Sequence, residues 1–280
     1  MMLWRFINSG ACLPEVNMAV DEAILIAQSE HKVPPTVRFY RWNPATLSIG
    51  YFQRADKEVK LDQIQQRQLG FVRRPTGGRA VFHDRELTYS IIVSETYPGI
   101  PKTVTEAYRV LSEGLLQGFR LLGLQAEMVN LATDEEKQKY AQAGSAACFD
   151  SPSWYELVVE GRKIAGSAQV RQKGVVLQHG SILLDLDIEL LFSLLKFENE
   201  RLRQRLQSSF SDKAVAINDL LVAAGKPKIE LAAVEQAFKQ GFAAGLDIEL
   251  EAGELTPYER ALAEDLVLNK YGNDAWNLRR

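Results

Sequence analysis

The chain has 280 residues, of which 46% are hydrophobic and 25% charged, with a formal net charge of -3 and a pI near 5.8. This balance is that of a globular protein with a sizeable core, and it argues against a non-specific nucleic-acid binder, whose surface would be basic. Two cysteines and three histidines are too few for a disulfide framework or a convincing metal cluster, so we expect a reduced, metal-free protein. The sequence has no apolar run near the roughly 20 residues that span a bilayer and no signal-peptide pattern, which predicts a cytoplasmic protein without membrane contact.

The N-terminal part of the chain predicts a helix followed by a hairpin. Apolar residues recur at helical spacing over residues 14–31, and this spacing places Asn17 and Asp21 near one another on the helix. Strand-like runs over residues 36–42 and 46–52 are joined by Asn-Pro-Ala, a sequence typical of turns. We therefore expect these two strands to pair with each other.

The next segment predicts two helices and two strands. A polar helix over residues 58–69 leads into a strand that begins at Phe71. Residues 87–93 alternate between apolar and more polar side chains, which predicts a strand with one buried face. The sequence Thr-Val-Thr-Glu at 103–106 is a capping box, and it opens a long amphipathic helix that ends at Gly123.

Three strands that pair in chain order are expected after Cys148. The turn-forming residues 149–153 follow this cysteine, so its thiol is expected on a loop. The chain then becomes apolar and β-branched, turns at Glu-Gly-Arg and returns with Lys163, a hairpin that could bring Lys163 back towards Cys148. A second turn of Gln-Lys-Gly leads into a third strand over residues 175–185, which completes a meander.

The rest of the chain is expected to be mostly helical. Further strands are predicted over residues 124–129 and 247–251, and further helices over 187–196, 213–223 and 231–244. Thr256-Pro-Tyr-Glu259 is a second capping box with proline at the first helical position, and this helix is expected to stop near Gly272. We expect one main domain over residues 1–250 and a C-terminal helical extension over 251–280 packed on it.

Adjacent glycines mark a candidate binding loop within residues 73–90. Gly77 and Gly78 would let the backbone pass close to a ligand or adopt positive φ, so the loop could cradle an acyl chain or a phosphate. Taken alone, a glycine pair in a β-rich region is more often a plain hairpin turn, and a nearby His83 is more often a surface or hydrogen-bonded residue.

Cys148 and Lys163 are the residues best suited to covalent chemistry. An ammonium near a thiol favours the thiolate, which can attack a thioester and form an acyl-enzyme that an amine resolves to an amide. The alternative is a small core cysteine and a solvated strand lysine, the commoner case for such residues. The sequence contains neither a Gly-x-Ser-x-Gly elbow nor a phosphate-binding Gly-x-x-x-x-Gly-Lys-Ser/Thr loop. His83 and His179 are each available as a general base for Cys148, although structural roles are more common, and Cys12 is expected to be inert.

Together these motifs resemble the biotin/lipoate protein ligase superfamily, and within it the cysteine octanoyltransferases that load the glycine cleavage H protein. The segments that carry the resemblance span nearly the whole chain and are residues 17–22, 40–50, 73–84, 148–157, 161–168 and 270–277. The resemblance implies an α/β (α+β) fold, with a mixed, largely antiparallel sheet flanked by helices. It places the active site between the Gly77-Gly78 loop and the Cys148 loop, within the main domain.

The resemblance also implies site residues and partners. Cys148 corresponds to the acylated cysteine, and Lys163 to the lysine that lowers its pKa and faces the acyl carbonyl. The residues that fall on the family's acyl-binding loop are Arg73, Gly77, Gly78 and His83. The implied donor is octanoyl-acyl carrier protein, and the implied acceptor is a lipoyl-domain lysine of the glycine cleavage H protein or of another lipoyl domain. No cofactor, metal or ATP is expected.

Two departures separate this chain from the ATP-dependent lipoate ligases that it resembles. Those ligases usually have a third glycine where this chain has Arg79, and they commonly carry an accessory domain for which only the helical tail could stand here. The alternatives are an ATP-dependent ligase, an amidotransferase that moves octanoyl groups from H protein to other lipoyl domains, and a non-catalytic acyl-carrier-binding module. Residues 148–157 favour the H-protein-loading branch, and a binding module would need neither Cys148 nor Lys163.

Overall fold

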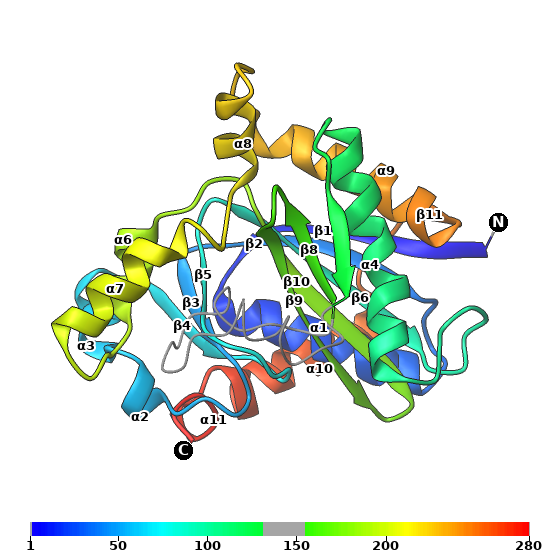
Figure 1. The fold of residues 1–280 in the computed structure, drawn as a ribbon. Coiled ribbons are helices and arrows are strands. Elements are labelled where there is room, and N and C mark those ends of the chain that lie inside the picture. Colours follow the sequence, from blue (N-terminus) through cyan, green and yellow to red (C-terminus); the bar gives the residue numbers. More distant parts are fainter. Residues whose placement is uncertain (1, 131–154, 280) are drawn as a thin grey trace.

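A mixed eight-stranded sheet forms the centre of the protein in this computed structural model, which describes residues 2–130 and 155–279 (Figure 1). In spatial order its strands are β11 (Ile248–Ala252), β1 (Met2–Cys12), β2 (Thr36–Trp42), β6 (Glu86–Ser94), β10 (Val175–Leu183), β9 (Arg162–Gln172), β8 (Tyr155–Val159) and β7 (Glu127–Asn130). β1 pairs in parallel with β2 and β11, and the other neighbours are antiparallel. The expected mixed, largely antiparallel sheet flanked by helices is confirmed.

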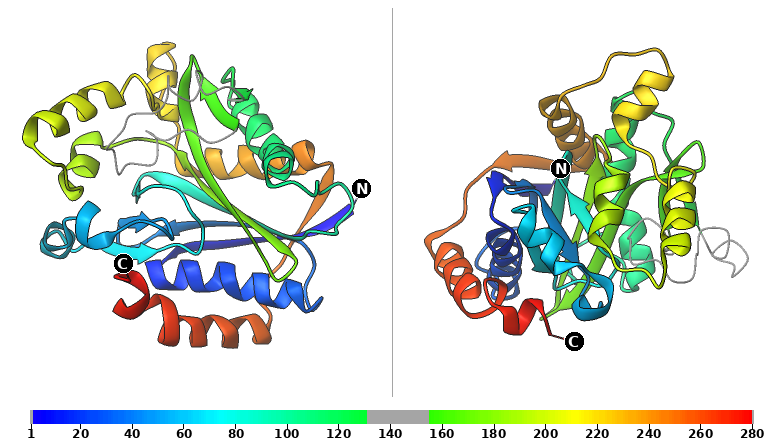
Figure 2. Two further views of the ribbon diagram at one scale, coloured as in Figure 1. Left: turned by 60° about the horizontal axis from the view of Figure 1, so that its bottom comes forward. Right: turned by 90° about the vertical axis from the view of Figure 1, so that its left-hand side faces the viewer.

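Helices cover both faces of this sheet, as Figures 1 and 2 show. One face carries α1 (Pro14–Ser29) and α10 (Pro257–Leu266), and the other carries α4 (Val104–Leu121) and α9 (Leu231–Leu246), with α8 (Ile217–Ala223) beside them. The apolar core is therefore split into two layers by the sheet. Within the described part of the chain, none of the helices combines the length and apolar character needed to cross a bilayer.

β6 is buried almost from end to end because it lies near the middle of a sheet that is covered on both sides. Its apolar side chains, such as Tyr89 and Ile91, pack towards α4 and α9. The expectation of one exposed face is wrong, since Glu86, Thr88 and Ser90 are also buried. These polar side chains belong to the site described below.

A smaller sheet adjoins the main one and has the order β4 (Gly70–Arg73), β3 (Thr46–Ile49), β5 (Val81–His83). The helices that complete its apolar core are α2 (Ala55–Glu58), α3 (Leu61–Gln66), α6 (Ile188–Leu194) and α7 (Glu200–Phe210). The expected hairpin between residues 36–42 and 46–52 is wrong. Both edges of β2 are occupied by β1 and β6, so β3 joins the smaller sheet instead.

The elements α2, α3, β1 and α7 differ from the sequence expectation. The helix expected over residues 58–69 is two short helices, α2 and α3. β1 was not predicted, because its buried run of Trp4, Arg5, Phe6 and Ile7 follows neither a helical nor an alternating pattern. α7 was not predicted because it is rich in arginine and buries only Leu206 and Phe210.

β8, β9 and β10 form the expected meander. Glu160-Gly161 and Lys173-Gly174 have positive φ at both positions, as two-residue type I′ hairpin turns require. The meander places Lys163 at the beginning of β9 and His179 in the middle of β10.

The C-terminal helices pack on α1 and return to β4. The predicted capping box of Thr256 and Glu259 opens α10, and Glu259 also binds Arg5 of β1 through a buried ion pair. The π-helical turn η2 (Val267–Tyr271) and α11 (Asp274–Asn277) follow. The side chain of Asn277 then accepts a hydrogen bond of 2.9 Å from the Arg73 amide.

α4 and α9 approach each other closely at glycines. A Cβ atom on Gly241 would lie 2.4 Å from the backbone nitrogen of Gly118. On the other helix, a Cβ atom on Gly114 would lie 2.2 Å from the ring of Phe242. A larger residue at Gly241 therefore requires the two helices to move apart.

We expect Gly241→Ala to lower the free energy of unfolding by about 2 kcal/mol in urea titrations. The clash is with backbone, so the overpacking cost should lie near the upper end of about 1–3 kcal/mol, above the gain in helix propensity of about 1 kcal/mol. Gln236→Ala, at an exposed position of the same helix, should stay within about 0.5 kcal/mol of the wild type. Equal stability of both variants would contradict this account of the packing.

Candidate active site

A mostly apolar cavity lies between the two sheets and α1. It contains about 390 Å³ of atom-free space, part of which is open to solvent. The residues that line it are Met18, Tyr40, Trp42, Arg74, Gly78, Val81, His83, Thr88, Gly166, Ser167, Ala168, His179, Gly180 and Ser181. A pocket of this kind, apolar with a few convergent polar groups, is typical of a small-ligand site.

The Gly77-Gly78 loop forms one side of the cavity. Gly78 has a φ of +90°, which other residues rarely adopt, and it packs so tightly that a Cβ atom on Gly50 would lie 2.1 Å from its carbonyl oxygen. The Arg74 guanidinium donates to the carbonyls of Gly77 and Arg79 at 3.2 and 2.8 Å. The loop thus has one fixed backbone conformation, which depends on glycine at positions 50 and 78.

The residues expected on the acyl-binding loop separate into two groups. Gly78 and His83 line the cavity, whereas Gly77 and Arg73 are not among its lining residues. The Arg73 guanidinium instead donates to backbone carbonyls of Gly50, Tyr51, Gln53, Trp276 and Arg279. Arg74 reaches the cavity in its place, since successive side chains of a strand point to opposite faces.

His83 is buried in the cavity wall and bonded at both ring nitrogens. Its ring stacks on Trp42 with centroids 4.3 Å apart. Nε2 lies 2.7 Å from the hydroxyl of Ser48, and Nδ1 lies 3.2 Å from a carboxylate oxygen of Glu86. Burial lowers the pKa of His83, although the Glu86 carboxylate acts in the opposite direction. The ring is therefore neutral near pH 7.

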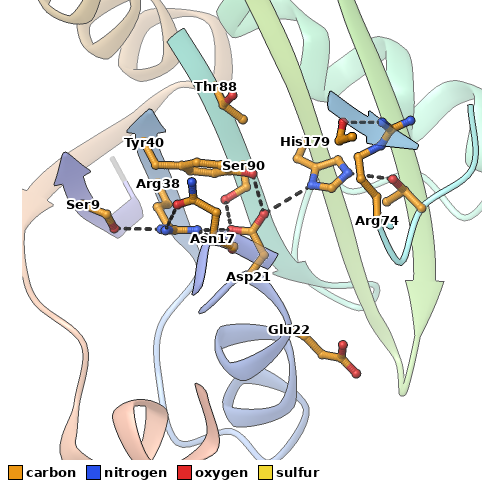
Figure 3. A network of polar contacts seen from close by, with 12 residues as sticks. Ser9, Asn17, Asp21, Glu22, Arg38, Tyr40, Arg74, Thr88, Ser90 and His179 are labelled. Atoms are coloured by element: carbon orange, nitrogen blue, oxygen red, sulfur yellow. Dashed lines mark hydrogen bonds and ion pairs between the residues drawn. The ribbon is translucent and has the colours of Figure 1, made fainter. Parts of the chain in front are cut away.

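A buried ion pair between Asp21 of α1 and Arg38 of β2 lies beside the cavity (Figure 3). The two charged groups are 2.7 Å apart, and both side chains are fully buried. Asp21 also accepts hydrogen bonds from Tyr40 and Ser90 at 2.9 and 2.8 Å. Burial alone would raise the pKa of Asp21, but the charge of Arg38 and the contact with His179 outweigh burial and hold that pKa below its usual value.

His179 connects this ion pair to the glycine loop. Its Nδ1 lies 3.3 Å from the Asp21 carboxylate, and its Nε2 lies 2.6 Å from the hydroxyl of Thr76. Burial lowers the pKa of His179, with hydrogen bonding to Asp21 opposing the shift. Like His83, this histidine is neutral near pH 7 and uses both nitrogens in hydrogen bonds.

Lys163 is a buried cation on the strand that forms another wall of the cavity. It lies three residues before Gly166, which is about 10 Å along β9. Its Nζ forms an ion pair of 2.8 Å with Glu156 of β8. Its backbone is bonded to that of Lys213 and Val215 on the other side. A cation held in this way can stabilise a thiolate or an oxyanion.

Cys148 lies outside the described residues, together with the rest of residues 131–154. Its distance from Lys163 therefore stays a prediction. Cys12, on β1, is half-buried and its thiol donates to the carbonyl of Ser9 at 3.4 Å. Among residues 2–130 and 155–279, no group of three or more His, Cys, Asp or Glu side chains is arranged to hold a metal ion.

Sequence reasoning did not identify Arg74, Glu156 or the Asp21–Arg38 pair as parts of a site. A signal for them was present, because polar residues occupy inner positions of apolar strands, as Arg38 does in β2 and Ser90 does in β6. A buried charge requires a partner, and Asp21 on the adjacent helix was available.

A family model for the lipoyl protein ligase A/B catalytic domain matches residues 13–243. The octanoyltransferase LipM of Brevibacillus brevis is 63% identical over 280 residues, which cover all of both chains. The octanoyltransferase LipM of Bacillus subtilis is 56% identical over 277 residues, or 99% of this chain and 98% of the relative.

Two solved structures share the fold over nearly the whole chain. The bi-partite lipoate protein ligase of Thermoplasma acidophilum, described with its E2 lipoyl domain, has a TM-score of 0.81 and 27% identity, and the match covers 100% of this chain and 98% of that one. A lipoate-protein ligase A bound with ATP has a TM-score of 0.79 and 26% identity, with 99% of each chain covered.

We expect His83→Gln to weaken the pH dependence of folding stability in the window below about pH 7. The unfolded chain takes up a proton on this histidine near its usual pKa of about 6.5, whereas the folded chain, whose His83 faces Glu86, Arg74 and His179, does so only at lower pH. Stability is therefore fully present above about pH 6.5 and is lost as the pH falls through this window, by at most about 1.4 kcal/mol per pH unit.

The measurement is the free energy of unfolding in urea at several pH values. His31→Gln serves as the control, because His31 is exposed. The pH profile of stability of His31→Gln should match that of the wild type. An unchanged pH profile for His83→Gln would show that the pKa of His83 is the same in the folded and the unfolded chain, which would contradict the prediction.

Proposed function

Because the chain belongs to the family of lipoyl protein ligase A/B catalytic domains, we propose that this octanoyltransferase passes the octanoyl group through a thioester on Cys148. The observation that carries the proposal is the buried Lys163–Glu156 pair on the strand that walls the cavity. The pair fixes the position of an ammonium group on the element where a cysteine nucleophile and an acyl carbonyl would need a cation.

A lipoyl domain is the kind of partner that this protein modifies. In the proposal, the donor is octanoyl-acyl carrier protein and the acceptor is a lipoyl-domain lysine of the glycine cleavage H protein. A thioester donor already carries an activated acyl group, so the reaction needs neither ATP nor a metal ion. The choice of the H protein over other lipoyl domains rests on the resemblance of residues 148–157 to the H-protein-loading branch. The proposed cytoplasmic location rests on the sequence alone.

The reaction has two steps. The Cys148 thiolate attacks the carbonyl carbon of the donor thioester, a new carbon–sulfur bond forms, and the carrier's thiolate leaves and takes up a proton. The acceptor amine then attacks the enzyme thioester, loses a proton as the amide bond forms, and releases the Cys148 thiolate. In both steps the Lys163 ammonium faces the negative charge on sulfur or on the carbonyl oxygen, and Glu156 holds the ammonium in place.

The cavity suits an unbranched acyl chain. Met18, Tyr40, Trp42 and Val81 present apolar surface to its interior. Each methylene group that moves from water into such a site contributes about 0.8 kcal/mol to binding.

We expect wild-type protein mixed with octanoyl-acyl carrier protein to gain the mass of one octanoyl group, which hydroxylamine removes. Cys148→Ser should not gain a hydroxylamine-labile group, because it lacks the sulfur. Cys12→Ser is the matched control and should be acylated like the wild type, since Cys12 lies on β1 with its thiol bonded to Ser9. Labile acylation that persists in Cys148→Ser would sink the assignment.

We expect Lys163→Met to slow acylation of Cys148 by about 100-fold or more, because it removes a charge that stabilises the transition state. Rapid-quench measurements with intact-mass detection give the rate. Lys226→Met, at an exposed position, is the control for loss of a lysine. The double variant Lys163→Met/Glu156→Gln removes both charges together, so slow acylation in a folded double variant separates a chemical effect from the cost of a broken buried pair. A wild-type rate in that variant would exclude the role.

The runner-up function is an ATP-dependent lipoate ligase, which the similarity to a lipoate-protein ligase A bound with ATP favours. Such an enzyme would release pyrophosphate when given octanoate or lipoate with ATP. Absence of pyrophosphate from a preparation that forms the Cys148 thioester would dismiss this alternative.

A further inference from the structure

The two buried histidines of the cavity wall are the centres of similar chains of hydrogen bonds. Each histidine has a carboxylate at Nδ1 and a hydroxyl at Nε2. One chain runs from Asp21 through His179 to Thr76, and the other runs from Glu86 through His83 to Ser48. These two sets of three residues are called the relays below. No step of the proposed reaction uses them.

The donor and the acceptor of each hydrogen bond in the first relay follow from the groups that Asp21 already binds. Asp21 already accepts from Arg38, Tyr40 and Ser90, and an ionised carboxylate has no proton to donate. Nδ1 of His179 must therefore carry the ring proton and donate to Asp21. In a neutral imidazole Nε2 is then an acceptor, so the hydroxyl of Thr76 donates to it.

The second relay has the same direction for a parallel reason. Glu86 accepts from the hydroxyls of Thr88 and Ser181, at 2.6 and 2.7 Å. At the other end, the Ser48 hydroxyl accepts from Arg74, which has only donors. The proton of Ser48 is thus free to point at Nε2 of His83, whose Nδ1 donates to Glu86.

Both relays are connected to the Gly77-Gly78 loop, the first directly through Thr76 and the second through Arg74. Thr76 is fully buried and immediately precedes Gly77, so the first relay holds the start of the loop. The second relay orients Ser48, which orients Arg74, whose guanidinium binds the carbonyls of Gly77 and Arg79. Thr76 thus holds the start of the loop and Arg74 holds its middle. In both relays the donor and the acceptor of each hydrogen bond are fixed.

We propose that these relays are positioning devices, which hold the Gly77-Gly78 loop in the conformation that receives the acyl chain. His83 and His179 act through Ser48 and Thr76, and their Nε2 lone pairs are occupied and thus not available to take a proton from Cys148. The proposal rests on the proposed function, because it assigns the octanoyl chain to the cavity that this loop walls.

The loop's own motion tests the relays without reference to acyl transfer. In hydrogen–deuterium exchange of the full chain, Thr76→Val should speed exchange across residues 76–80 by about tenfold, because the variant keeps the side-chain shape and leaves the buried Nε2 of His179 unbonded. Ser48→Ala should do the same through Arg74. Thr76→Ser keeps the hydroxyl and should restore slow exchange, which a purely steric role for the threonine methyl would not.

Ser112→Ala is the matched control. Ser112 is a fully buried serine on α4 that accepts a hydrogen bond from Gln178 and belongs to neither relay. This variant should leave exchange in the loop unchanged, and peptides from β6 should exchange alike in all the variants. Wild-type exchange in the loop of both Thr76→Val and Ser48→Ala would overturn the proposal.

Acylation kinetics test the second half of the proposal. Thr76→Val should raise the KM for octanoyl-acyl carrier protein by about tenfold, while the yield of thioester on Cys148 at saturating donor stays at the wild-type level. Faster hydrogen–deuterium exchange in the loop together with an unchanged KM would overturn the assignment of this loop to acyl binding. Absence of any thioester in the wild type would instead refute the proposed function, and the exchange experiment would still decide whether the relays hold the loop.

Discussion

The ion pair between Asp21 and Arg38 is the contact on which the arrangement of the site depends. Removing one partner of a fully buried pair typically costs about 3–5 kcal/mol, because the remaining charge cannot be solvated. Here Arg38 is further bonded to Ser9 and Asn17, so the charges are surrounded by fixed dipoles. The pair joins α1 to β2, and through His179 it extends to β10. The relative positions of three elements around the cavity thus follow from one electrostatic requirement.

Much of the fold was predictable because its signals are local. The spacing of apolar residues predicted α1, the capping boxes predicted the starts of α4 and α10, and glycine-containing turns predicted the meander of β8, β9 and β10. Strand pairing was less predictable. A run such as Thr36–Trp42 does not show that both of its edges will be occupied by strands distant in the sequence, and for that reason the expected hairpin with residues 46–52 was wrong.

Site features that depend on the local sequence were predictable. Contacts between residues that are distant in the sequence were not. The glycine pair indicated a loop that packs closely, and Lys163 was expected on a returning strand. Successive side chains of a strand point to opposite faces, so a shift of one residue along β4 decides whether Arg73 or Arg74 faces the cavity. His179 and Thr76 are 103 residues apart, and no local pattern joins them. The approach of Cys148 to Lys163 stays a prediction.

The hydrogen bonds of Arg73 have a consequence for folding on the ribosome. Its guanidinium binds carbonyls of Trp276 and Arg279, which are synthesised 203 and 206 residues later. β4 and the glycine loop that follows it are synthesised early. The carbonyls of Trp276 and Arg279 become available to Arg73 only after α11 and Arg279 have been synthesised. The wall of the cavity beside the glycine loop therefore acquires its final packing only once α11 can pack against β4.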